Sequence, residues 1–261
     1  MAPLKCGDPE LSLWAEGIIK QTEVEWRRAC AHPAGKAVAQ HGFKVFYSPV
    51  RAQPDVLVLG EQPGGGPSDF CLAVARQLPE GHEYFHSNYL LARKMRHLFA
   101  REPALLERSV KLNLNFCRSP SREAWHASTP ATVRDSLLAF CTRRVVEIID
   151  RLAPRVILCE GILPFDALQN HPRMASRVLP TERGEVRGRQ GERLYIRRQL
   201  ASGTQLMGMA HPTGAHVSSH DRERITTALW ADLGVFLQES KTMPGLRGCA
   251  RGQPATVVTL N

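Results

Sequence analysis

The chain has 261 residues, 43% hydrophobic and 23% charged, a composition typical of one large folded domain or two small ones. It contains no apolar run of about 18 residues and no secretion signal, so we expect no membrane span and a cytoplasmic location. The seven cysteines are odd in number and lack C-x-x-C spacing, which argues against a disulfide framework. The formal net charge of +9 fits a polyanionic partner, and an arginine-rich proteome equally well.

The first half of the chain predicts two helices and two buried strands. The pair Asp8-Pro9 is typical of an N-cap and first helical position, and apolar residues follow at helical spacing. The short apolar run 55–60 ends in glycine and predicts a buried strand, with a Gly- and Pro-rich loop over 61–68 behind it. A helix is expected over 88–100 and a second strand over 110–116.

The second half continues the alternation of helices and strands. Residues 183–199 hold six Arg and three Gly and predict a basic hairpin. The other expected elements are a long helix from Thr129-Pro130 to about Ala153, a third strand over 155–159 with a short helix after it, a fourth strand over 205–209, and a final helix to about Gln238 that Ser218 or Ser219 caps.

Short buried strands that alternate with helices indicate the α/β class. We predict a three-layer α/β/α sandwich with a central, mainly parallel sheet of about four strands. Residues 1–240 are expected to form a single domain. Residues 241–261 are expected to be a loose tail, in which Ala255 to Leu260 could add an edge strand.

Polar side chains follow several of the predicted strands. Glu61 and Gln62 come after the first strand, Asn113 and Asn115 lie near the end of the second, and His211 follows the fourth. Each has an ordinary structural alternative: a solvated loop acid, a satisfied turn amide, a packing imidazole. Because ligands bind beyond the carboxyl ends of parallel strands, we expect a carboxylate, an amide and an imidazole in one crevice. The loop lacks both the P-loop and the dinucleotide pattern, so no nucleotide cofactor is expected.

Together these segments resemble the uracil-DNA glycosylase superfamily. Residues 60–64 (GEQPG) resemble its water-activating motif, in the G-E-x-P-G form of the iron–sulfur-containing bacterial and archaeal branch. Residues 112–120 (LNLNFCRSP) are similar to that branch's T-N-x-x-K-C-R-P-P segment, and residues 210–213 (AHPT) to its H-P-S motif. Residues 153–161 (APRVILCEG) resemble its R-P-K-V-I-V-x-L-G strand. The similarity covers about residues 50–240, with the motifs in the same order.

Two departures from that branch stand out. Its cluster needs four cysteines, whereas only Cys6 and Cys30 precede the first motif, and Cys141 follows Cys117 at a long interval. We therefore expect no cluster, metal or other cofactor. Residues 214–217 (GAHV) stand where many relatives carry a bulky residue that fills the gap left by a flipped base.

The resemblance implies a DNA glycosylase, a hydrolase that cuts the N-glycosidic bond of a damaged or deaminated base, uracil first, in base-excision repair. Glu61 would stabilise the cationic sugar and orient a water, and His211 would donate to the departing base. Asn113 would read the base edge, with Asn115 as the alternative because both face the same side of the strand. Gln62 stands where some relatives have Asp, and its amide could still orient the water.

The remaining expected contacts complete a site for DNA with one base flipped out. Gly60, Pro63 and Gly64 would approach the base, and an aromatic ring, Phe85 rather than Phe70, would stack on it. No membrane partner is expected, and the protein is expected to be a monomer. Phosphate contacts are expected from Ser119, Ser121, Arg122, Arg187, Arg189, Arg193 and Ser218, although Ser218 also suits a helix cap.

Two other functions stay open. A non-catalytic nucleic-acid-binding protein on the same fold is favoured by Gln62 and by the weak wedge. A hydrolase of nucleosides or other small molecules is the third option, and the basic hairpin argues against it because a small neutral substrate needs no such surface.

Overall fold

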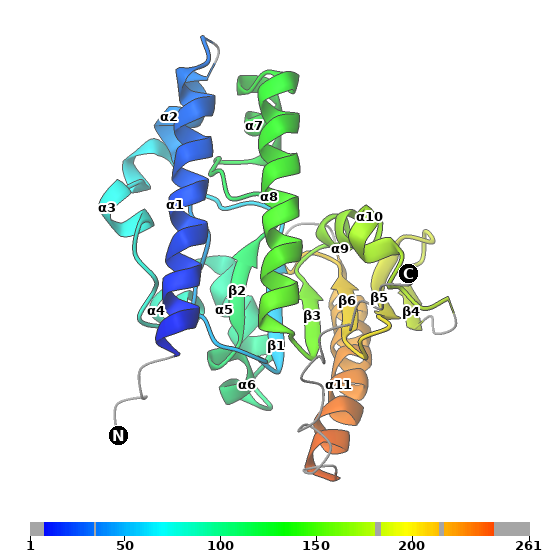
Figure 1. Cartoon of the computed structure of the whole chain (residues 1–261). Coiled ribbons are helices and arrows are strands. Elements are labelled where there is room, and N and C mark those ends of the chain that lie inside the picture. Colours follow the sequence, from blue (N-terminus) through cyan, green and yellow to red (C-terminus); the bar gives the residue numbers. More distant parts are fainter. Residues whose placement is uncertain (1–7, 34, 181–183, 214–216, 243–261) are drawn as a thin grey trace, which may run out of the picture.

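The computed structural model describes residues 8–33, 35–180, 184–213 and 217–242 (Figure 1). The predicted edge strand in the tail and most of the predicted wedge segment lie outside these ranges. The described helices are α1 (Pro9–Ala31), α2 (Lys36–His41), the 3-10 turn η1 (Pro67–Asp69), α3 (Leu72–Ala75), α4 (Glu83–His86), α5 (Leu90–Leu98), α6 (Pro103–Glu107), α7 (Arg122–Ser128), α8 (Ala131–Leu152), α9 (Ile162–Gln169), α10 (Pro172–Ala175) and α11 (Ser219–Thr242). The described strands are β1 (Val56–Gly60), β2 (Val110–Asn113), β3 (Val156–Cys159), β4 (Gly184–Arg187), β5 (Arg193–Gln199) and β6 (Gln205–Met209).

The strands form one mixed sheet in the order β2-β1-β3-β6-β5-β4. The pairs β1–β2, β1–β3 and β3–β6 are parallel, and β5 runs antiparallel to both β6 and β4. The prediction of the α/β class is confirmed. The predicted strand number of about four is wrong, because the basic hairpin does not stand apart: its strands β4 and β5 extend the sheet beside β6 to six strands.

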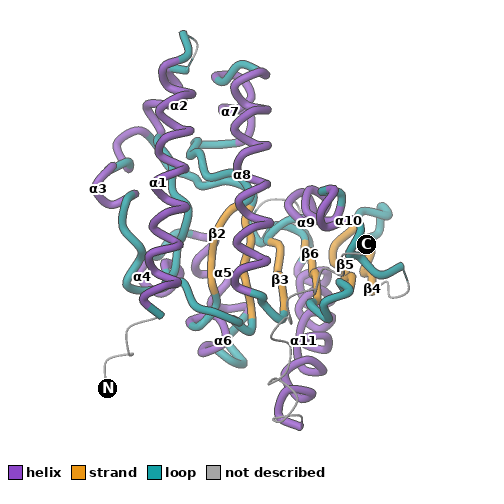
Figure 2. Tube along the Cα trace, in the orientation of Figure 1, coloured by secondary structure: helices purple, strands orange, loops and turns teal. Residues whose placement is uncertain are grey.

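Apolar side chains of the strands point alternately to two hydrophobic clusters, one on each face of the sheet. Leu57 and Leu59 of β1 join the cluster to which α1, α8 and α9 contribute. Val56 and Val58 join the cluster to which α5, α6 and α11 contribute. Figure 2 shows the strands side by side, from β2 near the middle of the molecule to β4 at one edge, with helices next to the sheet. Burial on both faces explains why these strands read as continuous apolar runs.

The helix boundaries follow local signals in the sequence. The side chain of Asp8 accepts from the backbone N–H of Glu10 at 3.0 Å, and Pro9 begins α1, as predicted. Helix α11 begins after Ser218, whose Oγ accepts from the N–H of Asp221 at 3.1 Å. Among the described residues, no helix combines the length and apolar character that a bilayer crossing requires.

The parallel strands place their carboxyl ends side by side. Gly60 of β1 pairs with Asn113 of β2, and Leu59 pairs with Cys159 of β3, so the three strands end almost level. In the next pair, Cys159 lies opposite Gly208, one residue before β6 ends. The segments that leave these strands therefore start from one edge of the sheet, where a ligand site is expected in such folds.

Candidate functional site

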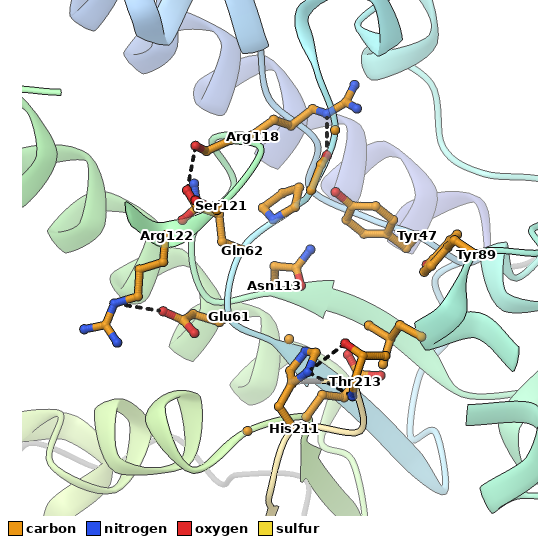
Figure 3. A pocket seen from close by; sticks show the side chains of 18 of the residues that line it. Tyr47, Glu61, Gln62, Tyr89, Asn113, Arg118, Ser121, Arg122, His211 and Thr213 are labelled. Atoms are coloured by element: carbon orange, nitrogen blue, oxygen red, sulfur yellow. Dashed lines mark hydrogen bonds and ion pairs between the residues drawn. The ribbon is translucent and has the colours of Figure 1, made fainter. Parts of the chain in front are cut away.

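A large open cleft of about 1650 Å³ lies at this edge of the sheet. Four segments that leave the parallel strands line it, each with a polar residue: Glu61 after β1, Asn113 at the end of β2, Glu160 after β3 and His211 after β6. Figure 3 shows Glu61, Asn113 and His211 around one space, with Gln62 beside them. The structure thus brings together the carboxylate, amide and imidazole that the sequence placed at separate strand ends.

The Gly- and Pro-rich loop after β1 is held against the segment that follows β2. Backbone N–H groups of that segment donate to the loop: Asn115 to the carbonyl of Glu61 at 2.9 Å, and Ser119 to the carbonyl of Pro63 at 3.0 Å. Arg118 adds side-chain bonds, from Nε to the carbonyl of Gly64 at 3.2 Å and from Nη1 to that of Asp69 at 2.7 Å. The segment after β2 therefore holds the loop that carries Glu61 in place.

Glu61 and Gln62 differ in how they present their polar atoms. The Glu61 side chain is 38% exposed, and its Oε1 lies 3.6 Å from Nε of Arg122. The Gln62 Nε2 atom is buried, and no acceptor among the described residues lies within hydrogen-bond distance. A buried amide donor that faces a cleft is satisfied by a water or a ligand, because an unpaired polar group is costly.

The two asparagines of the second strand have different surroundings. Asn113 lines the cleft. Asn115 does not: its Oδ1 accepts from the backbone N–H of Cys117 at 3.0 Å and lies 3.8 Å from Sγ of Cys141. Strand β2 ends at Asn113, earlier than predicted, so the two side chains do not share a strand face. Asn115 is a turn amide, and Asn113 is the amide available to a ligand.

His211 is held as a neutral hydrogen-bond donor. The backbone N–H of Thr213 donates to its Nδ1 at 3.3 Å, and Oγ1 of Thr213 lies 3.1 Å from the same atom. An imidazole that accepts at Nδ1 carries its proton on Nε2. Burial lowers the pKa of His211 below its ordinary value; Glu160 and Glu61 act in the opposite direction, and Lys111 reinforces the lowering.

The aromatic wall of the cleft is made mainly of tyrosines. Tyr47, Tyr84 and Tyr89 line it, and in Figure 3 Tyr47 and Tyr89 lie across the space from Glu61. Phe70 also lines it, and packs against Trp26 and Phe43 with ring centroids 5.6 and 6.2 Å apart.

The preference for Phe85 as the stacking ring is not supported by its position. Phe85 is 36% exposed and lies outside the lining of the cleft. Its neighbour Tyr84 is buried and lines the cleft instead, because the short helix α4 turns consecutive side chains in different directions.

The expected phosphate contacts divide into two groups. Ser119, Ser121, Arg122 and Arg193 line the cleft, whereas Arg187, Arg189 and Ser218 do not. Several are already engaged within the chain. The buried Ser119 hydroxyl donates to the carbonyl of Ser121 at 2.9 Å, and Arg193 makes two bonds to Asp166 at 2.8 and 2.5 Å.

Sequence reasoning missed a buried charged cluster in the floor of the cleft. Lys111 Nζ lies 2.6 Å from Oε2 of Glu160, and the hydroxyl of Tyr84 donates to the other carboxylate oxygen. A signal was present: Lys111 stands between the apolar residues Val110 and Leu112 of a buried strand, and Glu160 directly follows another buried strand. Charged residues at fully buried strand positions are rare unless they are paired.

The described cysteines, Cys30, Cys71, Cys117, Cys141 and Cys159, are all free thiols. Within the described ranges, no three His, Cys, Asp or Glu side chains are arranged to hold a metal ion. The pKa of the buried Cys117 thiol is raised well above its ordinary value, first by a hydrogen bond with Cys141 and then by burial. An iron–sulfur cluster needs four thiolates around one point, and the described cysteines are not arranged to supply them.

Comparison with known proteins gives no assignment. No protein-family model matches the chain. A search of curated protein sequences also finds no match. The function must therefore be argued from the geometry of the cleft.

Proposed function

We propose that this protein is a DNA glycosylase that hydrolyses the N-glycosidic bond of a damaged or deaminated base, with uracil as the first candidate. The observation that carries the proposal is the meeting of Glu61, Asn113 and His211 in one cleft from three different strands. The motifs that carry these residues are the ones that resemble the uracil-DNA glycosylase superfamily, and the same likeness supports a three-layer α/β/α arrangement.

The charges in the cleft suit heterolysis of a glycosidic bond. When the bond between C1′ and the base nitrogen breaks, the electron pair leaves with the base, and positive charge develops on the sugar. The Glu61 carboxylate would stabilise that cation and orient a water, with Gln62 as a second group on the water. The water oxygen then bonds to C1′, and its proton passes to Glu61.

The departing base needs a donor for its negative charge. His211 offers a neutral N–H at Nε2, because its Nδ1 accepts from Thr213. A neutral imidazole stabilises an oxyanion by hydrogen bonding without being consumed as an acid. Asn113 would read the edge of the base, and the tyrosine wall would supply stacking surface.

The rim of the cleft suits a polyanionic substrate. Arg122 is half-exposed beside Glu61, and Ser121 caps α7 next to it. A phosphate near Arg122 would compete with Glu61 for the guanidinium, and an exposed ion pair of this kind is weak enough to be exchanged. The net charge of +9 of the whole chain would favour the approach of DNA to the protein.

The direct test is an excision assay on a panel of oligonucleotides. Duplex and single-stranded DNA that carries uracil, hypoxanthine, xanthine or an alkylated base is incubated with the protein, and alkali then cleaves any abasic site. We expect strand cleavage with at least one lesion and none with undamaged DNA.

A non-catalytic nucleic-acid-binding function is the second candidate. The ion pair between Arg122 and Glu61 favours it, because it offsets the charge that catalysis requires. Tight DNA binding without cleavage of any lesion would select this alternative over the glycosylase.

A further inference from the structure

The floor of the cleft contains an ion pair that water barely reaches. The side chains of Lys111 and Glu160 are 4% and 1% exposed, and their charged atoms lie 2.6 Å apart. The Tyr84 hydroxyl donates to the second carboxylate oxygen of Glu160. Burying an ion pair is costly, and apolar residues of similar size are often as stable or more so. The pair therefore calls for a role beyond packing.

The ammonium group of Lys111 fixes the orientation of the Asn113 amide. Besides Glu160, Nζ donates to Oδ1 of Asn113 at 3.3 Å and to the carbonyl of Leu112 at 3.3 Å. A lysine ammonium has only donors, so the Asn113 atom that faces it must be the oxygen. The amide nitrogen is then turned away from the ammonium group.

Tyr47 lines the same cleft, and burial raises the pKa of its phenol well above the usual value. Asn113 acts in the opposite direction, as expected when its amide nitrogen and not its oxygen faces the phenol. The amide nitrogen carries two hydrogens, so a donor remains for a ligand in the cleft even when one hydrogen faces Tyr47.

Gly60, the last residue of β1, leaves space for this cluster because it has no Cβ atom. A Cβ atom on Gly60 would lie 2.1 Å from Oδ1 of Asn113, 2.7 Å from Nζ of Lys111 and 3.2 Å from Oε2 of Glu160. Only glycine leaves room for the three polar groups to meet there. Three strands thus cooperate to hold one amide.

We propose that Lys111, anchored by Glu160 and Tyr84, is a positioning residue that locks Asn113 with an N–H donor toward the ligand, so that the cleft selects bases with a carbonyl oxygen at that edge over bases with an amino group. This rests on the proposed function, since it assumes that a base enters the cleft. An amino group would bring its hydrogens against the hydrogen of Asn113, and the locked amide could not rotate to accept them.

The experiment measures binding, so it does not depend on cleavage. Two oligonucleotides carry 2′-fluoro-2′-deoxyuridine or 2′-fluoro-2′-deoxycytidine at the same mismatched position; the electron-withdrawing fluorine resists glycosidic cleavage. Fluorescence anisotropy gives the Kd of each. For wild type we expect tighter binding of the uracil oligonucleotide by roughly tenfold or more, the size of one lost hydrogen bond.

The variants separate positioning from stability. Lys111→Met should bring the uracil-to-cytosine ratio close to one. Because it leaves Glu160 buried and unpaired, Lys111→Met with Glu160→Gln is made as well, which removes both charges and keeps the shape. The matched control is Lys44→Met. Lys44 also lines the cleft and lies 4.5 Å from the Tyr47 ring centroid, but it makes no bond to Asn113 among the described contacts.

Each outcome bears on the proposal separately from the glycosylase assignment. Loss of discrimination in the folded double variant, with Lys44→Met unchanged, supports it whatever the excision assay shows. Equal binding of the two oligonucleotides by wild type would overturn it, as would a double variant that keeps the wild-type ratio. In either of those cases the glycosylase proposal still stands or falls on excision alone.

Discussion

At the scale of single residues, the cleft contains two kinds of side chain. Some are proposed to stabilise charges that develop in the reaction, and others hold neighbouring residues in position. Glu61 and His211 present a carboxylate and a neutral imidazole, while Thr213 and Arg118 only fix the position of their neighbours. The first two should therefore matter for reaction rate far more than for binding.

Replacing Glu61 or His211 tests this division. Glu61→Gln keeps the shape and loses the charge opposite the cationic sugar, and His211→Ala removes the donor to the departing base. Each should slow single-turnover excision by roughly a hundredfold or more, while DNA affinity changes little. Excision that survives Glu61→Gln intact would move the water-orienting role to Gln62 or Asp69.

The lowered pKa of His211 predicts the acid limb of the rate profile. In the proposed mechanism the active form is the neutral imidazole, and burial holds the pKa of His211 below the ordinary value of about 6.5. The excision rate should therefore stay level as pH falls from 8 to about 6.5 and decline only below that. Single-turnover rates in buffers of constant ionic strength give the profile. A decline that starts above pH 7 and disappears in His211→Ala would contradict the assignment.

At the scale of elements, the end of β1 shows how backbone and side chains share space. Gly60→Ala should push the Lys111–Glu160–Asn113 cluster apart and destabilise the fold by roughly 1–3 kcal/mol, because the neighbours are buried and cannot yield. Gly64→Ala is the stability control, since a Cβ there meets nothing within 4 Å. Urea unfolding measures both variants, and equal midpoints would show that the cluster adjusts freely.

The arginines on the cleft rim and on the hairpin differ in how readily their guanidinium groups could contact a DNA phosphate. Each arginine that neutralises a DNA phosphate contributes about 0.9 to the slope of log affinity against log salt. Arg122→Ala and Arg189→Ala should each reduce the slope by about that amount. Both terminal guanidinium nitrogens of Arg193 are bound to Asp166, so its contribution should be small.

Arg151→Ala serves as the control for this series. Arg151 is 45% exposed near the end of α8, where it pairs with Glu10 at 2.6 Å, and it belongs neither to the cleft lining nor to the basic hairpin. Its replacement lowers the net charge equally and should leave the slope nearly unchanged. A uniform reduction across all variants would mean that net charge, and not a defined surface, attracts DNA.

At the scale of the whole molecule, acid stability should depend on His82, which ties α4 to the start of β2. Its Nδ1 accepts from the N–H of Tyr84 at 3.2 Å, and its Nε2 lies 3.0 Å from Oγ of Ser109. Burial first, and then the charge of Lys111, lower its pKa to about 3. The folded state therefore holds His82 neutral at pH values where the unfolded chain protonates it.

The sign of this effect follows from proton linkage. The stabilisation is complete above the unfolded pKa of about 6.5 and is lost at roughly 1.4 kcal/mol per pH unit as pH falls toward 3. Urea unfolding at pH 7 and pH 5 should differ by about 2 kcal/mol from this residue. His82→Asn, which can still cap α4, should reduce that difference. The same pH dependence in the variant would assign the loss to other groups.

The sequence by itself determined several of the elements and the polar residues at their ends. Continuous apolar runs ending in glycine or a polar residue located β1, β3 and β6, and the Asp8-Pro9 pair located the start of α1, because these signals act over a few residues. The rule that ligands bind at the carboxyl ends of parallel strands was enough to select Glu61, His211 and one of the two asparagines as cleft residues.

Only the tertiary structure decided which side chains meet. Lys111 and Glu160 are 49 positions apart, and their pairing depends on β1 lying between their strands, which no local pattern specifies. The choice of Asn113 over Asn115 depended on where β2 ends, and that of Tyr84 over Phe85 on how a single turn of helix packs. The hairpin likewise joins the sheet because β6 offers it an unpaired edge. Burial and hydrogen bonding between distant segments set these outcomes. Such interactions are hard to detect in a single sequence; here the sign was Lys111, a charged residue between two apolar residues of a strand.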